Sequence, residues 1–426
     1  MKKTKDLNTN KGITLIALVI TIIVMLILVA VTISMAVNGG LFDYAGKAVG
    51  ETNNAIANES EGYDQYVQDM LIKYGIEEGP ITNPYEADDW EYAWTCTDGV
   101  WSEMLTKGQE AEGDMVTKFY KTGKKISNDE IGIPEGNEYH LIIEKNGNEE
   151  NIAPLANVNE NMQMISADAW EKQVFDMMNG NSDEFPIIAY VTELIVCEGV
   201  TNIPDACVYY GYNLNKITMG NTVENIGNYA FCFCGSLSDI NMSTNLKSVG
   251  NGAFFYCLKL ERVEFPYGLI SVGDLAFYGG LVKSMVMPDS IVSFGIANFF
   301  ENSNLTNVKL SNSMPVISKA MFNGCSNLTN ITIPNCVTTI EENAFGDCTN
   351  LIKIKFLTTD ASKITIADDV FADSENNGTS QEGISNLPEG SKIYVLSEDM
   401  KTKLEGTYDS TKTTVEVVTL EEMNSI

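Results

Sequence analysis

The stretches "VENIGNYAFCFCGSLSDINM" (223–242), "LKSVGNGAFFYCLKLERVEF" (246–265) and "VTTIEENAFGDCTNLIKIKF" (337–356) are copies of one pattern, V-x-x-I-x-x-x-A-F-x-x-C-x-x-L-x-x-I-x-I. Its aromatic position is occupied by Phe231, Phe254, Phe277, Phe299, Phe322 and Phe345, with Cys207 in the same place one turn earlier. Successive members are 24, 23, 23, 22, 23 and 23 residues apart. A fixed period of this length indicates stacked structural repeats.

Each repeat contains one strand signal and one turn. Ile331 and Ile333 alternate with polar residues, which is the pattern of a half-buried strand. The chain then turns back, and the small Ala344 leaves room for Phe345 beside it. One repeat cannot bury its own apolar face, so we expect about seven repeats over 191–371 to stack into a continuous core with a parallel sheet.

This pattern resembles the BspA-type leucine-rich repeats of bacterial surface proteins, roughly from Val191 to Phe371. The resemblance implies a leucine-rich repeat solenoid. Asn298 and Met321 depart from it by replacing the alanine before the phenylalanine, and the cysteine column fails at Gly280 and Asn302. We expect looser turns at these positions.

The rest of the chain predicts a mixed fold, in which a membrane helix and a small β-rich domain precede the solenoid. Short strand-like segments alternate with turn signals such as Asp98-Gly99 and Thr122-Gly123, and the segment 392–418 has a strand, helix, strand pattern. We divide the chain into a basic leader (1–12), a transmembrane helix (13–37), an extracellular helix and linker (38–78), a small β-rich domain (79–150), a connector (151–190), the solenoid (191–371) and a C-terminal cap (372–426).

The N-terminal segment predicts a membrane anchor. No charge occurs from Ile13 to Val37, and 25 helical residues are long enough to span a bilayer. Four lysines against Asp6 give +3 before Ile13; the net charge of the whole chain is -31, so the remainder carries -34. This asymmetry predicts a cytoplasmic N-terminus and an extracellular body, in a bacterial cell membrane crossed once.

The stretch "KGITLIALVITII" (11–23) also resembles the N-terminus of type IV prepilins and pseudopilins. The resemblance implies cleavage between Gly12 and Ile13, and an apolar helix able to assemble subunits. The fifth residue of the mature helix is usually Glu in that family, whereas here it is Ala17. This departure puts ordered filament assembly in doubt, while the leader and Gly12 remain.

No catalytic pattern emerges, and we expect no enzyme, no cofactor and no metal. The only histidine, His140, lies in a strand-like segment and is expected to be structural. The loop "DSENNG" (373–378) resembles a calcium loop, but Ile384 stands where a bidentate acid belongs. An acidic body repels phosphate backbones, so nucleic acid is not expected as a partner.

Two residue classes invite a functional interpretation but are expected to belong to the core. Trp90, Trp94 and Trp101 could stack on carbohydrate, yet a small β domain needs large aromatic core residues. Two cysteine pairs, Cys234 with Cys257 and Cys325 with Cys348, lie one repeat apart, within reach of a disulfide. We expect buried free thiols, because parallel neighbours in a ladder do not readily reach disulfide torsions.

The candidate binding face consists of the strand residues on either side of the middle isoleucine, which face away from the core. One column contains Lys216, Asp239, Arg262, Ser284, Asn307, Asn330 and Lys353; the other contains Thr218, Asn241, Glu264, Val286, Lys309, Thr332 and Lys355. These side chains carry both charge signs and none is aromatic, which suits a hydrated macromolecular contact; a merely soluble surface is the alternative.

Two functions fit these observations. One is a membrane-anchored cell-surface protein whose solenoid is a protein-interaction or adhesion module, with a protein or glycan as ligand. The other is a minor pilin or pseudopilin of a filament or secretion apparatus. Ala17 favours the first function, and the prepilin-like leader supports the second.

Overall fold

The computed structural model describes residues 80–86, 89–97, 100–101, 104–105, 115–130, 132–145, 187–367, 369–371, 387–404 and 413–426. The chain divides into two compact units, Met1–Gly79 and Pro80–Ile426. The predicted leader, membrane helix and extracellular helix therefore lie outside the described residues, as do most of the connector and the calcium-like loop. Within the described part of the chain, no helix has the length and apolar character needed to cross a bilayer.

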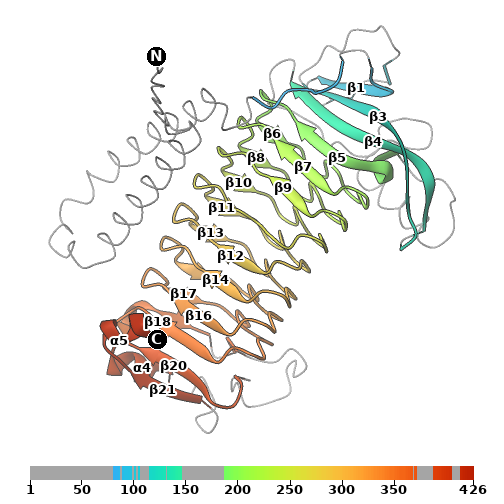
Figure 1. Cartoon of the computed structure of the whole chain (residues 1–426). Helices are drawn as coiled ribbons and strands as arrows, with labels where there is room; N and C mark the ends of the chain where they lie inside the picture. The colour runs from blue at the N-terminus through green and yellow to red at the C-terminus, as the bar shows by residue number, and fades with distance from the viewer. Residues whose placement is uncertain are drawn as a thin grey trace, which may run out of the picture. The chain divides into compact units, whose positions relative to one another are not determined.

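Stacked coils form the predicted solenoid (Figure 1), and most of them add one strand to a face of parallel strands, hydrogen-bonded in three segments, that we call the larger sheet. Its solenoid strands are β5 (Val191–Val196), β7 (Lys216–Met219), β9 (Asp239–Asn241), β12 (Ser284–Val286), β14 (Asn307–Lys309), β16 (Asn330–Ile333) and β18 (Lys353–Phe356). Neighbouring strands pair in parallel, for example β16 with β18 through Ile331 and Ile354. The predicted parallel sheet is confirmed.

A second parallel ladder, in two hydrogen-bonded segments, runs along another side of the coils, where we expected only a turn. Its two-residue strands are β6 (Asn202–Ile203), β8 (Asn225–Ile226), β10 (Ser248–Val249), β11 (Ser271–Val272), β13 (Ser293–Phe294), β15 (Val316–Ile317), β17 (Thr339–Ile340) and β19 (Thr365–Ile366). In β10 and β11 the serine is half-buried and the valine is buried, so each short strand still contributes one apolar residue to the core.

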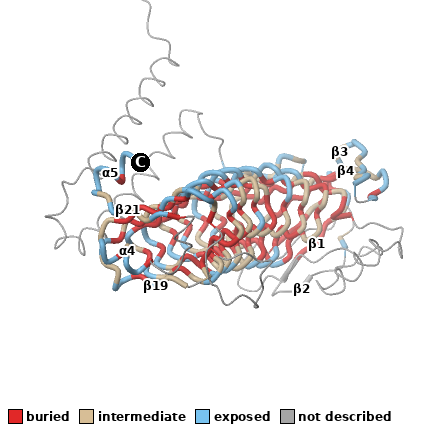
Figure 2. Tube along the Cα trace, turned by 90° about the horizontal axis from the view of Figure 1, so that it is seen from below, coloured by how far each residue is buried: buried red, intermediate tan, exposed pale blue. Residues whose placement is uncertain are grey.

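Buried residues, in red, occur all along the coils (Figure 2), and the core that they form contains a continuous column of stacked phenylalanine rings. Phe277 lies 5.2 Å from Phe254 and 5.7 Å from Phe299, measured between ring centroids, and both pairs are stacked. Asn298, beside this column, is fully buried, and its amide donates to the carbonyls of Gly273 and Gly295 at 2.8 Å. The expectation of a looser turn is therefore wrong at Asn298.

The cysteines form a ladder of thiol hydrogen bonds. Cys234, Cys257, Cys325 and Cys348 are free and buried, and each Sγ donates to a backbone carbonyl of the preceding coil over 3.0 to 3.3 Å. This confirms the prediction of buried free thiols. Asn302 takes the place of a cysteine, and its amide donates to the Phe277 carbonyl at 2.9 Å, so this turn is also held in place.

The β-rich segment does not form a sheet of its own. Its elements are β1 (Tyr92–Thr97), β2 (Val100–Trp101), β3 (Met115–Asn128), β4 (Ile133–Lys145) and the 3-10 helix η1 (Ile187–Tyr190). The strand order β2-β1-β3-β4-β5-β7-β9 makes the antiparallel meander continuous with the solenoid, because β4 pairs in parallel with β5. The meander therefore covers the N-terminal edge of the larger sheet.

The C-terminal segment has the predicted strand, helix, strand order. After η2 (Ala361–Lys363) in the last coil, it contains β20 (Ser391–Val395), α4 (Glu398–Leu404), β21 (Thr413–Val417) and α5 (Leu420–Ser425). β20 pairs in parallel with both β18 and β21, so the larger sheet gains two strands beyond the last repeat. Met400 and Leu404 of α4 are fully buried and close the core at this end.

The thiol ladder predicts slow alkylation. Burial raises the pKa of the Cys348 thiol to about 12, and burial likewise raises the pKa of Cys234, Cys257 and Cys325. The thiolate is the reactive form, so iodoacetamide at about pH 8 should leave these four thiols unmodified in the native protein. The half-buried Cys336 should react first. Peptide mass spectrometry checks this; disulfide-linked peptides from either pair would contradict it.

Candidate functional site

The outer face of the larger sheet presents the two predicted columns to solvent. Burial alternates along each strand: in β7, Ile217 and Met219 are buried, while Lys216 is exposed and Thr218 half-buried. The columns are in register, because Ser284 pairs with Asn307 and Asn330 pairs with Lys353. The exposed members are Lys216, Asp239, Asn241, Arg262, Glu264, Ser284, Val286, Asn307, Lys309 and Asn330; Thr332 is half-buried.

The N-terminal end of this face is covered by a small second core. It contains Trp90, Tyr120 and Ile195, against which Ile81 and Tyr85 pack. Trp90 and Trp94 are 3% and 0% exposed, so for these two the core interpretation is confirmed and carbohydrate stacking is not. The side chain of Trp101 lies outside the described residues.

His140 lies at the edge of this covered end. Its Nδ1 is 2.5 Å from the Tyr85 hydroxyl and 3.7 Å from the Glu193 carboxylate. Glu193 also forms an ion pair with Lys216 at 2.8 Å. Burial lowers the pKa of His140, although Glu193 and Glu138 oppose the shift. The ring is held between its neighbours, which agrees with the structural role that the sequence predicts.

The C-terminal end of the face is covered by helix α5, which corrects the candidate face at two positions. The Nζ atoms of Lys353 and Lys355 donate to the carbonyls of Ile426 and Met423, at 3.1 and 3.0 Å. Met423 is 1% exposed, and burial lowers the pKa of Lys355. The two lysines therefore hold the end of the chain against the sheet and are not available as an open surface.

Helix α5 forms because its first turn is capped. The Thr419 hydroxyl accepts a hydrogen bond from the Glu422 backbone N–H, and the Glu422 carboxylate accepts one from the Thr419 N–H. This capping box satisfies two backbone donors that have no partner within the helix. The open part of the outer face is consequently limited to the coils from Lys216 to Thr332.

The strand pairing of the larger sheet is interrupted between β14 and β16 and also, in the middle of this open part, between β9 and β12. Only a single bridge, Arg262 with Ser284, connects the coil after β9 to β12. The interruption between β9 and β12 lies beside the one 22-residue step, between Phe277 and Phe299. Ser284 still pairs in register with Arg262 on one side and with Asn307 on the other, so the columns continue across it.

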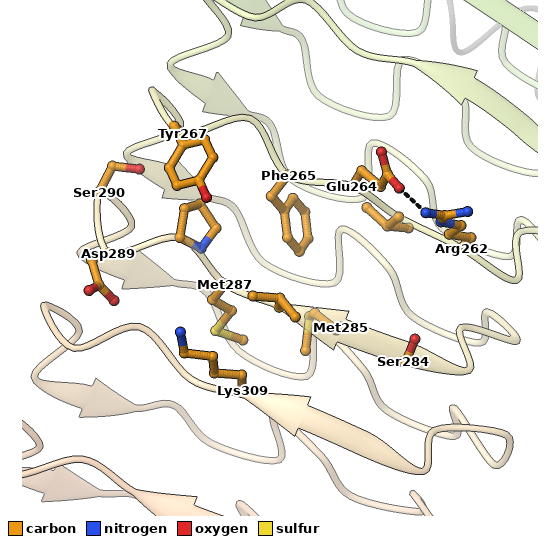
Figure 3. Close-up of a pocket in the computed structure, with 13 residues that line it drawn as sticks. Arg262, Glu264, Phe265, Tyr267, Ser284, Met285, Met287, Asp289, Ser290 and Lys309 are labelled. Carbon is orange, nitrogen blue, oxygen red and sulfur yellow. Dashed lines mark hydrogen bonds and ion pairs between the residues drawn. The ribbon is translucent and has the colours of Figure 1, made fainter. Parts of the chain in front are cut away.

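A pocket of about 460 Å³ lies at this interruption (Figure 3). Its floor is apolar, with Phe265 and Met287 buried. Its rim is polar: Arg262 and Glu264 form an ion pair, and Lys309 lines the opposite side. These three charged residues belong to the predicted columns, and the tertiary structure brings them around one cavity.

The two columns contain only five of the lining residues, and the others, among them four described next, were missed in the sequence analysis. Tyr267 is 86% exposed on the rim, whereas Phe265, Met287 and Asp289 follow the strand segments of their coils. Asp289 accepts hydrogen bonds from the Asn312 backbone and side chain, which fixes its carboxylate. The 22-residue step was visible in the sequence and could have indicated this coil.

This geometry defines a leucine-rich repeat solenoid with an open, polar sheet face. The family model for the BspA type leucine rich repeat region matches residues 182–299 and 270–379, with six copies. The repeat region of this chain therefore belongs to the BspA-type leucine-rich repeat family, as the sequence pattern predicts. Regions of this kind are typically binding modules.

Several solved structures resemble the chain. A leucine-rich repeat protein from T. pallidum is 24% identical, with 38% of this chain and 78% of that chain covered and a TM-score of 0.35. A leucine-rich cell surface protein from Faecalibacterium prausnitzii is 16% identical, with coverages of 72% and 99% and a TM-score of 0.22. The pneumococcal vaccine antigen PcpA is 13% identical, with coverages of 72% and 98% and a TM-score of 0.25. No curated protein matches the chain.

The environment of His140 predicts a pH dependence. Its folded-state pKa lies below the ordinary value of 6.5, so the unfolded chain takes up a proton first as the pH falls. The contribution of this group to stability is thus lost as the pH drops below about 6.5. Because the chain has one histidine, NMR of histidine-labelled protein reports its titration directly.

A His140→Asn variant is the control, because its amide does not titrate. Between about pH 7 and pH 5, the melting temperature of the wild type should fall more than that of this variant. A titration midpoint at or above 6.5 in the folded protein would contradict the prediction.

Proposed function

We propose that this protein is a membrane-anchored, cell-surface binding protein, and that the open outer face of its solenoid acts as an interaction or adhesion module for a macromolecular ligand. The observation that carries the proposal is the open middle of the larger sheet, where a pocket is surrounded by Arg262, Glu264 and Lys309. Both ends of the sheet are covered, so a ligand approaching this face meets the pocket region.

The chemistry of the pocket favours binding over catalysis. Arg262 is neutralised by Glu264, and Asp289 is occupied by Asn312. An apolar floor with a charged rim matches the usual anatomy of a protein interface, in which an anchor side chain enters a pocket and polar groups surround it. We therefore propose a protein or glycan surface as ligand, no enzymatic activity and no cofactor.

The anchor part of the proposal rests on the sequence of the N-terminal segment. The uncharged stretch from Ile13 to Val37 is long enough to span a bilayer, and the lysines before it favour a cytoplasmic N-terminus. The solenoid would then be displayed outside a bacterial cell. The filament alternative gains no support from the comparisons, since none of the relatives described above is a pilin.

Replacing Arg262, Glu264 and Lys309 together by Ala should weaken adhesion of cells that display the protein to a host or neighbouring-cell surface. We expect a loss of about tenfold or more, because a single central contact is often worth over 1–2 kcal/mol. Since these side chains are exposed, the free energy of unfolding should change by less than about 0.5 kcal/mol. Counting adherent cells and recording thermal unfolding measure the two effects.

A matched control removes the same charges elsewhere. Lys319 and Glu342 form an exposed ion pair outside the two columns, and Lys363 is likewise exposed. The triple change of these residues to Ala should leave adhesion unchanged. Equal adhesion by both triple variants and the wild type would rule out the outer face as the contact.

The leader predicts a defined processing site. We expect the mature chain to begin at Ile13, because Gly12 follows a basic leader and precedes an uncharged segment. Edman sequencing of protein extracted from membranes checks this. Recovery of Met1 as the first residue would instead indicate an uncleaved signal anchor, with the same predicted topology.

A further inference from the structure

A second set of aromatic side chains follows the core phenylalanines in the first five coils. We call this set the aromatic ridge; it consists of Tyr209, Tyr210, Phe233, Phe255, Tyr256, Tyr278 and Phe300, each of them half-buried. The rings stack from coil to coil. Phe233 lies 4.7 Å from Tyr210 and 5.6 Å from Tyr256, with interplanar angles of 1° and 4°. Tyr278 lies 4.9 Å from Phe255 and 5.0 Å from Phe300.

The fold does not require aromatic residues at these positions. Tyr210, Phe233 and Tyr256 have φ values of 61°, 60° and 54°, in the left-handed region that disfavours bulky side chains. The following coils place Gly279, Glu301, Gly324 and Asp347 at the same position with the same backbone conformation. The first coils therefore retain large rings where the later coils use glycine or a short or polar side chain. The backbone conformation recurs in the later coils, so the rings, and not the backbone, distinguish the first coils.

The ridge is free of charge in four of its five coils, and in the fifth the exposed Glu301 follows Phe300. The turn segments 206–212, 229–235, 252–258 and 275–281 contain no charged residue, although 20% of the chain is charged and its net charge is -31. Two copies of so acidic a molecule repel each other. Close contact between copies is consequently least unfavourable along an uncharged stripe such as this one.

The orientation of the rings restricts what they bind. The stacked faces of Phe233 and Tyr278 are occupied by their neighbours, so mainly the ring edges remain open. A sugar ring stacks on an aromatic face, whereas other aromatic and aliphatic side chains contact ring edges favourably. A second aromatic ridge supplies such side chains at the same spacing of about 5 Å between coils.

We propose that the aromatic ridge joins two copies of this chain in an isologous contact, in which the ridge of one copy packs against the ridge of the other. In such a contact the centre of the patch meets its own counterpart. The ridge is narrow, five coils being only about 20 Å long at 4.8 Å per step, so the association is weak and concentration-dependent. The proposal uses a different surface from the outer face and is independent of it.

Cysteine cross-linking of the full chain on the cell surface tests this contact. Leu258 is 46% exposed in the third of the five coils, two residues after Tyr256. Thr349 is exposed at the equivalent position four coils later, beyond the ridge. After mild oxidation, Leu258→Cys should yield a disulfide-linked dimer and Thr349→Cys should yield at least fivefold less. Of the eight cysteines described as free, seven are buried and Cys336 is half-buried, so they interfere little.

A ridge variant distinguishes specific contact from random collision. Tyr256→Gly and Tyr278→Asn introduce the residues that Gly324 and Asn323 already supply at those positions, so the fold should persist, as circular dichroism can verify. Adding both changes to Leu258→Cys should reduce the amount of cross-linked dimer at least fivefold. Adhesion of the cells should stay at the wild-type level, because it depends on Arg262, Glu264 and Lys309. Equal cross-linking at Leu258 and Thr349, or a dimer unaffected by the ridge changes, would overturn the proposal. The proposal would also be overturned if the two ridge changes abolished binding of the protein to a neutral oligosaccharide but left the dimer intact.

Discussion

Stacking of one phenylalanine per coil on the next is the interaction on which the rest of the structure depends. From Phe231 to Phe371 the centroids of neighbouring rings lie 5.2 to 6.0 Å apart. Each ring is buried only because the coils on both sides supply its surroundings, so a single coil has no stability of its own. The nearly constant period places each ring beside the last, and the 22-residue step still keeps Phe299 stacked on Phe277 at 5.7 Å.

This constraint acts on the inward side of each strand and leaves the outward side free. The two ends of the stack carry a further requirement, because an uncovered terminal coil would expose apolar side chains and unpaired backbone groups. The β4 meander at one end and β20, β21 and α5 at the other cover them. These covers also remove Lys353 and Lys355 from the open face, so the middle coils, where the period shortens by one residue, hold the pocket.

Equivalent positions in different coils show which residue types the fold itself needs and which it does not explain. Tyr256, Gly279 and Asp347 share one backbone conformation, so the backbone alone does not explain the aromatic ring. The cysteine ladder shows the opposite case: Asn302 replaces a thiol and makes the same hydrogen bond to a carbonyl of the preceding coil. There an amide and a thiol serve equally as the donor, and Gly280 shows that one coil does without it.

The sequence alone determined the repeat, its period, the inward and outward sides of each larger-sheet strand and the burial of the cysteines. All of these depend on contacts between residues about 23 positions apart, and the periodic pattern records such contacts directly. Tertiary structure decided the second ladder, the continuity of β4 with β5, the pocket around Phe265 and the covering of Lys353 by a carbonyl 73 residues away. The second ladder follows the same period, but its two-residue strands are too short to show an alternating pattern. The other features depend on segments that share no period, so no local pattern of residues encodes them.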